Sequence, residues 1–122
     1  MTALVVDDDA MNREVLRRMM SVGGWSVQDV QGGKLALAAC SSTRFDLVLV
    51  DLMMPDMDGY ETARAIRGLY ASRNQVTTII VVTGSDSMDA EESLVFDGIL
   101  AKPFTADELH ACIDNAGKGL DR

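Results

Sequence analysis

Short apolar runs recur along this chain, and segments of helical pattern separate them. Residues 3–6 (ALVV) and 47–50 (LVLV) are continuous apolar runs, which is the pattern of strands buried on both faces of a sheet. Residues 78–82 (TIIVV) predict a further buried strand, and residues 99–101 predict a short last one. Residues 25–30 (WSVQDV) alternate between apolar and polar, which indicates a strand nearer the edge of the sheet.

The segments between these strands carry apolar residues at the three- and four-residue spacing of amphipathic helices. The segment before the last strand is weaker in this pattern and is acidic. Thr105, followed by Glu108 three residues later, predicts a capping box at the start of the final helix. The predicted helices span residues 12–20, 34–42, 60–70, 86–96 and 105–116.

Strands that alternate with helices favour an α/β fold, because right-handed βαβ crossovers build a parallel sheet that helices cover on both faces. The 122 residues are enough for one domain around one core. In such sheets the working site lies at the carboxyl ends of the strands. The polar residues that follow four of the predicted strands are Asp7, Asp8, Asp9, Asp51, Thr83 and Lys102.

The charge balance excludes one class of partner. There are 19 Asp and Glu residues against 11 Lys and Arg, so the net charge is -8 at pH 7. A nucleic-acid-binding domain usually carries a basic surface, and we therefore expect no direct contact with nucleic acid. No apolar run is long enough to cross a membrane, and no basic-then-apolar leader is visible. We therefore expect a cytoplasmic domain without membrane contact.

Three consecutive carboxylates, Asp7, Asp8 and Asp9, end the first predicted strand. Carboxylates this close repel one another, and burial raises the cost of each charge. Their simplest role is to cap the next helix and to interact with its dipole, and we expect Asp9 to do only this. Two of them together with Asp51 would form an oxygen-rich pocket of the kind that Mg²⁺ prefers, and the cation would relieve the repulsion.

The other polar strand ends suit phosphoryl transfer. A phosphoryl group between Mg²⁺ and Lys102 would have its charge neutralised from two sides. Thr83 can donate a hydroxyl hydrogen bond to a phosphoryl oxygen, and Asp51 can act as a carboxylate nucleophile that gives an aspartyl phosphate. Asp56 and Asp58, in the loop after Asp51, are expected to be turn residues.

Four motifs together resemble the receiver domain of two-component response regulators, the CheY-like superfamily. They are LVVDDD, LVLVDLMMPDMDG, IIVVTG and AKPFT, and they occur in the family's order over essentially the whole chain. The resemblance implies a flavodoxin-like (βα)5 fold, a three-layer sandwich whose parallel five-stranded sheet has the order 2-1-3-4-5. It also implies a single receiver domain over residues 1–122, with no output domain in this chain.

The resemblance implies a metal site with Mg²⁺ as the cofactor. Asp51 matches the phosphoacceptor of the family, Asp8 matches the direct metal ligand, and Asp7 matches the acidic neighbour that binds mainly through water. Met53 matches the position whose backbone carbonyl is the third protein ligand. The metal set implied for this chain is therefore Asp7, Asp8, Asp51 and Met53.

The resemblance also assigns catalytic roles beside Asp51. Thr83 matches the switching hydroxyl residue, and Lys102 matches the lysine that contacts the phosphate. In the family the peptide bond that corresponds to Lys102–Pro103 is cis. Gly59 matches a small position that backbone or phosphate approaches closely.

Two features depart from the family pattern. Ile99 occupies the family's aromatic switch position, so a ring that swings inward cannot couple phosphorylation to output here. The span from Thr83 to Lys102 is shorter than usual by about a helical turn, and residues 86–96 lack the customary alanine-rich stretch. We therefore expect the phosphorylation chemistry of the family with an altered route of signal transmission.

The predicted function is phosphorelay signal transduction. A histidine kinase or a histidine-phosphotransfer protein donates a phosphoryl group to Asp51 in a Mg²⁺-dependent reaction, and the domain then changes conformation. Such a domain catalyses only its own phosphorylation and dephosphorylation, alone or as part of a hybrid histidine kinase. The signal passes to an unidentified downstream protein, and we expect a monomer or a weak dimer.

Two other functions stay open. A pseudo-receiver is an interaction module that never takes phosphate, and the complete set of acidic, Thr and Lys residues argues against it. A haloacid-dehalogenase-type Mg²⁺-dependent phosphatase also uses an aspartate after an apolar strand. Those enzymes carry the pattern D-x-D-x-T/V, whereas the acidic run here is followed by Ala10 and Met11.

Overall fold

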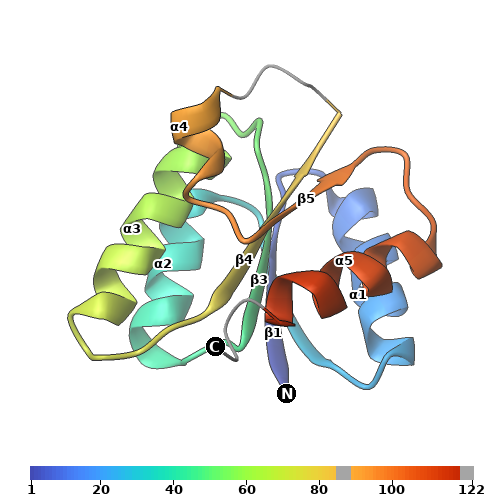
Figure 1. Ribbon diagram of the computed structural model, residues 1–122, viewed down its shortest axis with the longest axis horizontal. Helices are drawn as coiled ribbons and strands as arrows, with labels where there is room; N and C mark the ends of the chain where they lie inside the picture. The colour runs from blue at the N-terminus through green and yellow to red at the C-terminus, as the bar shows by residue number, and fades with distance from the viewer. Residues whose placement is uncertain (85–88, 119–122) are drawn as a thin grey trace.

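Parallel strands form the centre of the protein, and helices lie on both sides of them (Figure 1). The computed structural model describes residues 1–84 and 89–118. Within these residues the strands are β1 (Thr2–Val6), β2 (Ser26–Val30), β3 (Leu47–Asp51), β4 (Thr78–Thr83) and β5 (Gly98–Ala101). The helices are α1 (Ala10–Val22), α2 (Gly33–Ser42), α3 (Gly59–Ala71), α4 (Ala90–Ser93) and α5 (Ala106–Lys118). None of the helices so described is long and apolar enough to cross a membrane.

The strands lie in the order β2-β1-β3-β4-β5, and each neighbouring pair is parallel. This confirms the predicted α/β fold and its strand order. The alternating segment forms β2 at one edge of the sheet, where its side chains are exposed or half-buried. The continuous apolar run of β3 lies inside the sheet, and every residue of Leu47–Asp51 is buried. The alternating pattern of β2 therefore matches its place at the edge of the sheet, and the continuous apolar pattern of β3 matches its place inside it.

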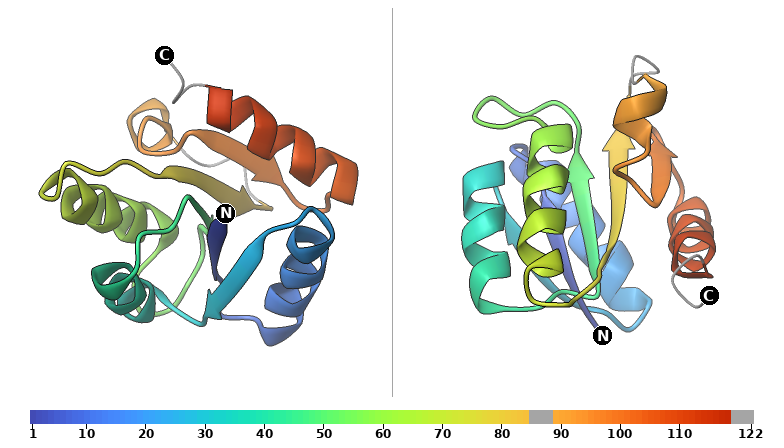
Figure 2. Two further views of the ribbon diagram at one scale, coloured as in Figure 1. Left: turned by 90° about the horizontal axis from the view of Figure 1, so that it is seen from below. Right: turned by 60° about the vertical axis from the view of Figure 1, so that its left-hand side comes forward.

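The core has two halves because successive residues of a strand point to opposite faces of the sheet. On one face of β1, Ala3 and Val5 belong to an apolar cluster with residues of α1 and α5. On the other face, Leu4 and Val6 belong to a cluster with residues of α2 and α3. Figure 2 shows the resulting layers, with α1 and α5 on one side of the sheet and α2 and α3 on the other.

The fourth helix differs most from the sequence-based expectation. The sequence predicts a helix over residues 86–96, of which residues 86–88 lie outside the described part of the chain. The helix α4 spans only Ala90–Ser93, so the prediction is wrong for residues 94–96. Those residues form a turn and then lead into β5.

Tertiary contacts explain why the helix ends early. Phe96 is 8% exposed and belongs to the core cluster shared with α2 and α3. Arg67 of α3 donates hydrogen bonds to the Val95 carbonyl at 2.6 Å and to the Asp97 carboxylate at 2.8 Å. Asp97 in turn accepts a 2.8 Å hydrogen bond from the Ile79 N–H of β4. The helix therefore ends early because the burial of the Phe96 ring and these hydrogen bonds stabilise a non-helical backbone.

Capping side chains fix the starts of two long helices. The Glu108 N–H donates to the Thr105 hydroxyl at 3.1 Å, and the Thr105 N–H donates to the Glu108 carboxylate at 3.0 Å. This confirms the predicted capping box of α5. Asp58 and Glu61 form a second capping box at the start of α3, where the sequence analysis expects only a turn residue at Asp58.

Tyr70 of α3 holds the loop between α2 and β3. It is 1% exposed. Its hydroxyl donates to the Thr43 carbonyl at 3.0 Å and accepts from the Phe45 N–H at 3.1 Å. Burial raises the pKa of the Tyr70 phenol to about 12, so the hydroxyl stays neutral at ordinary pH. One side chain thus satisfies two backbone groups that the sheet and the helices do not pair.

We expect Tyr70→Phe to lower the free energy of unfolding by about 1–3 kcal/mol, because the Phe45 N–H loses its acceptor in a buried place. Urea unfolding followed by circular dichroism measures the change. Tyr60→Phe, at a half-buried position of the same helix, is the control and should change the free energy by less than about 0.5 kcal/mol. Equal losses in the two variants would contradict the role given to the Tyr70 hydroxyl.

Candidate functional site

The polar residues at the ends of four strands meet at one edge of the sheet. Asp7 follows β1, Asp51 and Thr83 end β3 and β4, and Lys102 follows β5. Lys102 Nζ lies 3.7 Å from Asp51 Oδ2 and 3.9 Å from Asp7 Oδ2. The Thr83 carbonyl accepts a 2.9 Å hydrogen bond from the Lys102 N–H, which joins the ends of β4 and β5. The peptide bond between Lys102 and Pro103 is cis, as the resemblance implies.

Asp7, Asp8 and Asp51 form an acidic cluster. Each offers one carboxylate oxygen, and these oxygens lie within 4.8 Å of one another. Asp7 and Asp51 are buried, at 1% and 9% exposed, whereas Asp8 is exposed. The Met53 N–H donates to Asp51 Oδ1 at 3.3 Å, so Met53 lies directly beside the cluster, while the ligand role of its carbonyl stays a prediction. Such a set of oxygens suits a hard divalent cation.

Asp7 is fixed except at one oxygen. Its N–H donates to the Val30 carbonyl of β2 at 3.2 Å, and its Oδ1 accepts from the Asp9 N–H at 2.9 Å. Its Oδ2 has no hydrogen-bond partner among the described residues and faces Lys102. Asp9 caps α1, as the sequence predicts. A buried carboxylate oxygen without a partner is costly, and a bound cation would satisfy it.

The pKa values of the cluster also indicate that a bound cation would stabilise it. Burial raises the pKa values of the Asp7 and Asp51 carboxyl groups above the ordinary aspartate value, and the neighbouring carboxylates add to the rise. The Lys102 ammonium and adjacent backbone N–H groups lower these pKa values in part. One lysine thus offsets only some of the burial and repulsion, and the residues present fit a cation that supplies the remainder.

The loop after β3 folds back onto the end of that strand. The Gly59 N–H donates to the Leu52 carbonyl at 2.8 Å. A Cβ atom at Gly59 would lie 2.5 Å from the Asp51 carbonyl oxygen, so only glycine permits this approach. The close backbone approach expected at Gly59 is therefore present.

Asp56 has a structural role that the sequence analysis misses. Its carboxylate accepts hydrogen bonds from the Gly33 N–H at 3.4 Å and the Lys34 N–H at 3.2 Å, at the start of α2. Backbone N–H groups, first that of Met57 and then those of Lys34 and Gly33, hold the pKa of the Asp56 carboxyl below its ordinary value. Asp56 therefore connects the loop after Asp51 to the first turn of α2. The partners are more than twenty residues away, and no local signal marks them.

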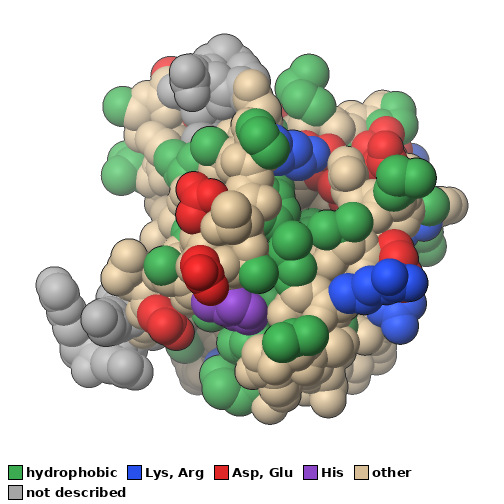
Figure 3. All heavy atoms as spheres, turned by 90° about the vertical axis from the view of Figure 1, so that its right-hand side faces the viewer, with side chains coloured by type: hydrophobic (Ala, Val, Ile, Leu, Met, Phe, Trp, Pro, Cys, Tyr) green, Lys and Arg blue, Asp and Glu red, His purple; other side chains and the backbone are tan. Residues whose placement is uncertain are grey.

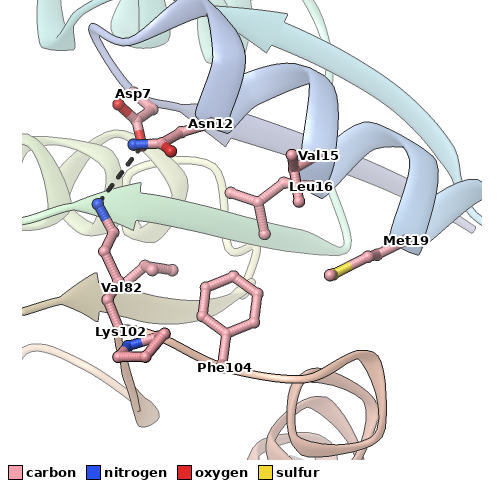
Figure 4. Close-up of a pocket in the computed structure, with 9 residues that line it drawn as sticks. Asp7, Asn12, Val15, Leu16, Met19, Val82, Lys102 and Phe104 are labelled. Carbon is pink, nitrogen blue, oxygen red and sulfur yellow. Dashed lines mark ion pairs between the residues drawn. The ribbon is translucent and has the colours of Figure 1, made fainter.

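An apolar cavity opens beside the acidic cluster. It has a volume of about 460 Å³ and lies between α1 and the segment that follows β5 (Figure 4). Asp7, Asn12 and Lys102 line its polar end, and the remaining lining residues are Val15, Leu16, Met19, Val82, Pro103 and Phe104. On the face of α1 and α5, Figure 3 shows hydrophobic side chains gathered in the middle and charged side chains around them. One end of the cavity is therefore charged, at Asp7 and Lys102, and the rest of its lining is mainly apolar.

Ile99 lies outside the core. It belongs to β5 at the edge of the sheet, pairs in register with Val81, and is 52% exposed. The residue at the family's aromatic switch position is thus an exposed aliphatic side chain in this structure. Its effect on signal transmission stays a prediction.

Comparison with known sequences gives a consistent result. A family model described as the response regulator receiver domain matches residues 3–114. Response regulator MprA of Mycolicibacterium vanbaalenii is 41% identical over 111 residues, which are 88% of this chain and 46% of that protein. Response regulator MprA of Mycobacterium avium is 40% identical over 114 residues, which are 91% of this chain and 48% of that protein. The chain thus spans about half the length of these curated relatives.

Solved structures of similar fold cover nearly the whole chain. The response regulator TrrA of Thermotoga maritima, in complex with Mg²⁺ and BeF, has a TM-score of 0.84 and 29% identity, over 94% of this chain and 97% of that one. The receiver domain of a Pseudomonas aeruginosa sensor histidine kinase, with magnesium in its active site cleft, has a TM-score of 0.80 and 29% identity, over 95% and 97%. The chemotaxis protein CheY4 of Vibrio cholerae has a TM-score of 0.83 and 29% identity, over 94% and 97%.

We expect Asp7→Asn to stabilise the metal-free protein by an amount on the order of 1 kcal/mol, because it removes a buried charge whose cost the Lys102 ammonium, 3.9 Å away, offsets only in part. A carboxyl whose pKa is raised by folding contributes stability that is complete below its unfolded pKa and is lost as the pH rises through its folded pKa. The gain should therefore be present at neutral pH and vanish in acid. Thermal unfolding in EDTA, from acid to neutral pH, measures this gain in stability.

The matched control is Asp114→Asn, an exposed position on α5 that changes the net charge by the same amount. It should leave the unfolding temperature nearly unchanged at each pH. If the two variants gained equally, the effect would come from net charge, and the burial argument for Asp7 would be wrong.

Proposed function

Because this chain belongs to the response regulator receiver-domain family, we propose that it is a phosphoacceptor module of a phosphorelay. Asp51 receives a phosphoryl group from a phosphohistidine donor, which is a histidine kinase or a histidine-phosphotransfer protein. The observation that carries the proposal is the position of Lys102 Nζ, 3.7 Å from Asp51 Oδ2 and next to the acidic cluster. A positive charge beside a carboxylate nucleophile suits the transfer of a negatively charged group.

The acidic cluster is the Mg²⁺ site in this proposal. Asp8 and Asp51 are direct ligands, Asp7 acts mainly through water, and the Met53 carbonyl completes the protein ligands. Bound there, Mg²⁺ neutralises carboxylate charge and the charge of an incoming phosphoryl oxygen. Support comes from Asp7 Oδ2, which accepts no hydrogen bond among the described residues, from the raised pKa values, and from the magnesium named for the Thermotoga and Pseudomonas structures.

The transfer step in this proposal uses Asp51, Lys102 and Thr83. A carboxylate oxygen of Asp51 attacks the phosphorus of the donor, a P–O bond forms, and the P–N bond to the donor histidine breaks. The leaving imidazole keeps the electron pair and takes a proton from solvent. Lys102 balances negative charge at the phosphoryl group, and Thr83 donates a hydroxyl hydrogen bond to one of its oxygens. The product is an aspartyl phosphate, which water later hydrolyses.

The output step differs from the family pattern. The acyl phosphate shifts the domain between two conformations, and a downstream protein distinguishes them. Because residue 99 is the exposed aliphatic Ile99, the coupling proposed here does not use an aromatic ring that swings inward from this position. Residues 1–122 act as one receiver domain in the cytoplasm, as a monomer or weak dimer, and make no contact with nucleic acid or membrane.

We expect Asp51→Asn to abolish phosphorylation, because an amide is not a nucleophile for this transfer. Intact-mass measurement after incubation with acetyl phosphate, with and without Mg²⁺, tests this. The wild type should gain one phosphate only when Mg²⁺ is present. Asp9→Asn is the matched control, since asparagine caps a helix as well as aspartate, and it should be labelled like the wild type.

The same experiment separates the competing functions. Full labelling of Asp51→Asn would place the phosphate elsewhere and would remove the proposed acceptor. A wild type that gains no phosphate from acetyl phosphate and binds no Mg²⁺ at millimolar concentration would be a pseudo-receiver. Steady turnover of a small phosphate ester would support a phosphatase instead.

We expect Lys102→Ala to keep Mg²⁺ binding and to lose the conformational change that phosphorylation drives. The lysine is not among the proposed metal ligands, and its Nζ lies 3.7 Å from Asp51 Oδ2, the proposed acceptor. Amide chemical shifts with and without Mg²⁺, and then with BeF as a phosphoryl mimic, measure the two steps separately. Lys34→Ala, on α2, is the control, and an equal response of both variants to BeF would remove Lys102 from the site.

A further inference from the structure

We propose that Arg13 is a positioning residue of the metal site. It holds the backbone of Asp7 in place and is itself held by Asp29 of β2. The inference rests on the proposed function, because it concerns the site at which Mg²⁺ supports phosphoryl transfer to Asp51. It assigns a role to an ion pair outside the acidic cluster.

The geometry joins three elements through one side chain. Arg13 Nη1 donates to the Asp7 carbonyl oxygen at 2.7 Å, and Arg13 Nε donates to Asp29 Oδ2 at 3.0 Å. The Arg13 side chain is 16% exposed, and that of Asp29 is 29% exposed. Solvent therefore screens this pair less than an exposed ion pair. The planar guanidinium connects α1, the end of β1 and β2, and its two bonds need its fixed fork of donors.

The contact matters because of what else holds Asp7. The Asp7 N–H is bonded to the Val30 carbonyl of β2, and Asp7 Oδ1 is bonded to the Asp9 N–H. With the carbonyl bonded to Arg13, the backbone of Asp7 is fixed on both sides. In this position Asp7 Oδ2 faces Lys102, and the Asp7 carboxylate lies close to those of Asp8 and Asp51. Arg13 thus acts on the cluster through the peptide plane of Asp7.

Other arginines of α1 do not share this geometry. Arg17 Nε lies 3.8 Å from Asp29 Oδ1, and its side chain is 49% exposed. Arg18 Nε bonds to Glu14 at 2.8 Å on the helix surface, and its side chain is 79% exposed. Arg18 is therefore a matched control: the same residue type, in the same helix, with a carboxylate partner, but away from Asp7.

The experiment compares Arg13→Ala, Arg13→Lys and Asp29→Asn with Arg18→Ala in the full chain. Titration calorimetry gives the Mg²⁺ dissociation constant. Amide hydrogen exchange in the metal-free protein gives the local protection of the Asp7 and Asp9 N–H groups. We expect Arg13→Ala to weaken Mg²⁺ binding about tenfold, the usual scale for partners that orient metal ligands. Exchange at Asp7 and Asp9 should also accelerate, while exchange in β3 and β4 stays unchanged.

Arg13→Lys should recover only part of both effects, because an ammonium keeps the charge but cannot reach the carbonyl and Asp29 in the same fork. Asp29→Asn should give a smaller loss of the same kind. If Arg13→Ala matched Arg18→Ala in affinity and in exchange, the inference would be overturned. It would also fail if Arg13→Ala accelerated exchange equally over all strands, since the role would then be general stability.

A failure of the proposed function gives a different result. A wild type that binds no Mg²⁺ at millimolar concentration would contradict the metal site itself. The exchange data on the metal-free protein would still decide whether Arg13 holds Asp7. The two ideas are therefore tested separately.

Discussion

The structure depends on how two buried carboxylates, Asp7 and Asp51, are held near each other at one edge of the sheet. Each is costly as an ion because burial and repulsion raise its pKa, and one lysine, 3.7 and 3.9 Å away, offsets only part of that cost. A site with unbalanced negative charge attracts a divalent cation, and with the cation present it attracts a phosphoryl group. The proposed phosphoryl transfer therefore depends on carboxylate charge that Lys102 balances only in part.

The scaffold keeps the two carboxylates together despite their repulsion, because the ends of β1 and β3 are held in place by the core. β1 and β3 are neighbours inside the sheet, with apolar clusters on both faces, so the strand ends cannot move apart without opening the core. Two further contacts lie beside the carboxylates themselves. Gly59 allows the loop after β3 to pack against the Asp51 backbone, and Arg13 donates a hydrogen bond to the Asp7 carbonyl. The packed strands and these two contacts together keep the carboxylates in place.

The edge of the sheet formed by β5 is built differently from its centre. β5 lies at an edge, α4 is a single turn, and Ile99 is exposed, so this side has fewer constraints than the strands around the cluster. Arg67 compensates by joining α3 to the segment between α4 and β5. In the proposed function, a change at Asp51 would reach this surface through backbone and packing shifts, since the exposed residue at position 99 is aliphatic.

The strands, most of the helices and the meeting of the polar strand ends could be predicted from the sequence. Continuous apolar runs predicted the buried strands, alternation placed β2 at an edge, and the polar residues after each strand predicted the cluster, because parallel strands bring their carboxyl ends to one edge. Features that depend on contacts between distant residues became visible in the folded structure alone. The helix after β4 ends at Ser93 because Phe96 enters the core and Arg67 bonds to the Val95 carbonyl and the Asp97 carboxylate. Asp56 reaches α2, and Asp29 holds Arg13. Local propensity carries no information about such partners, whereas strand periodicity records burial directly.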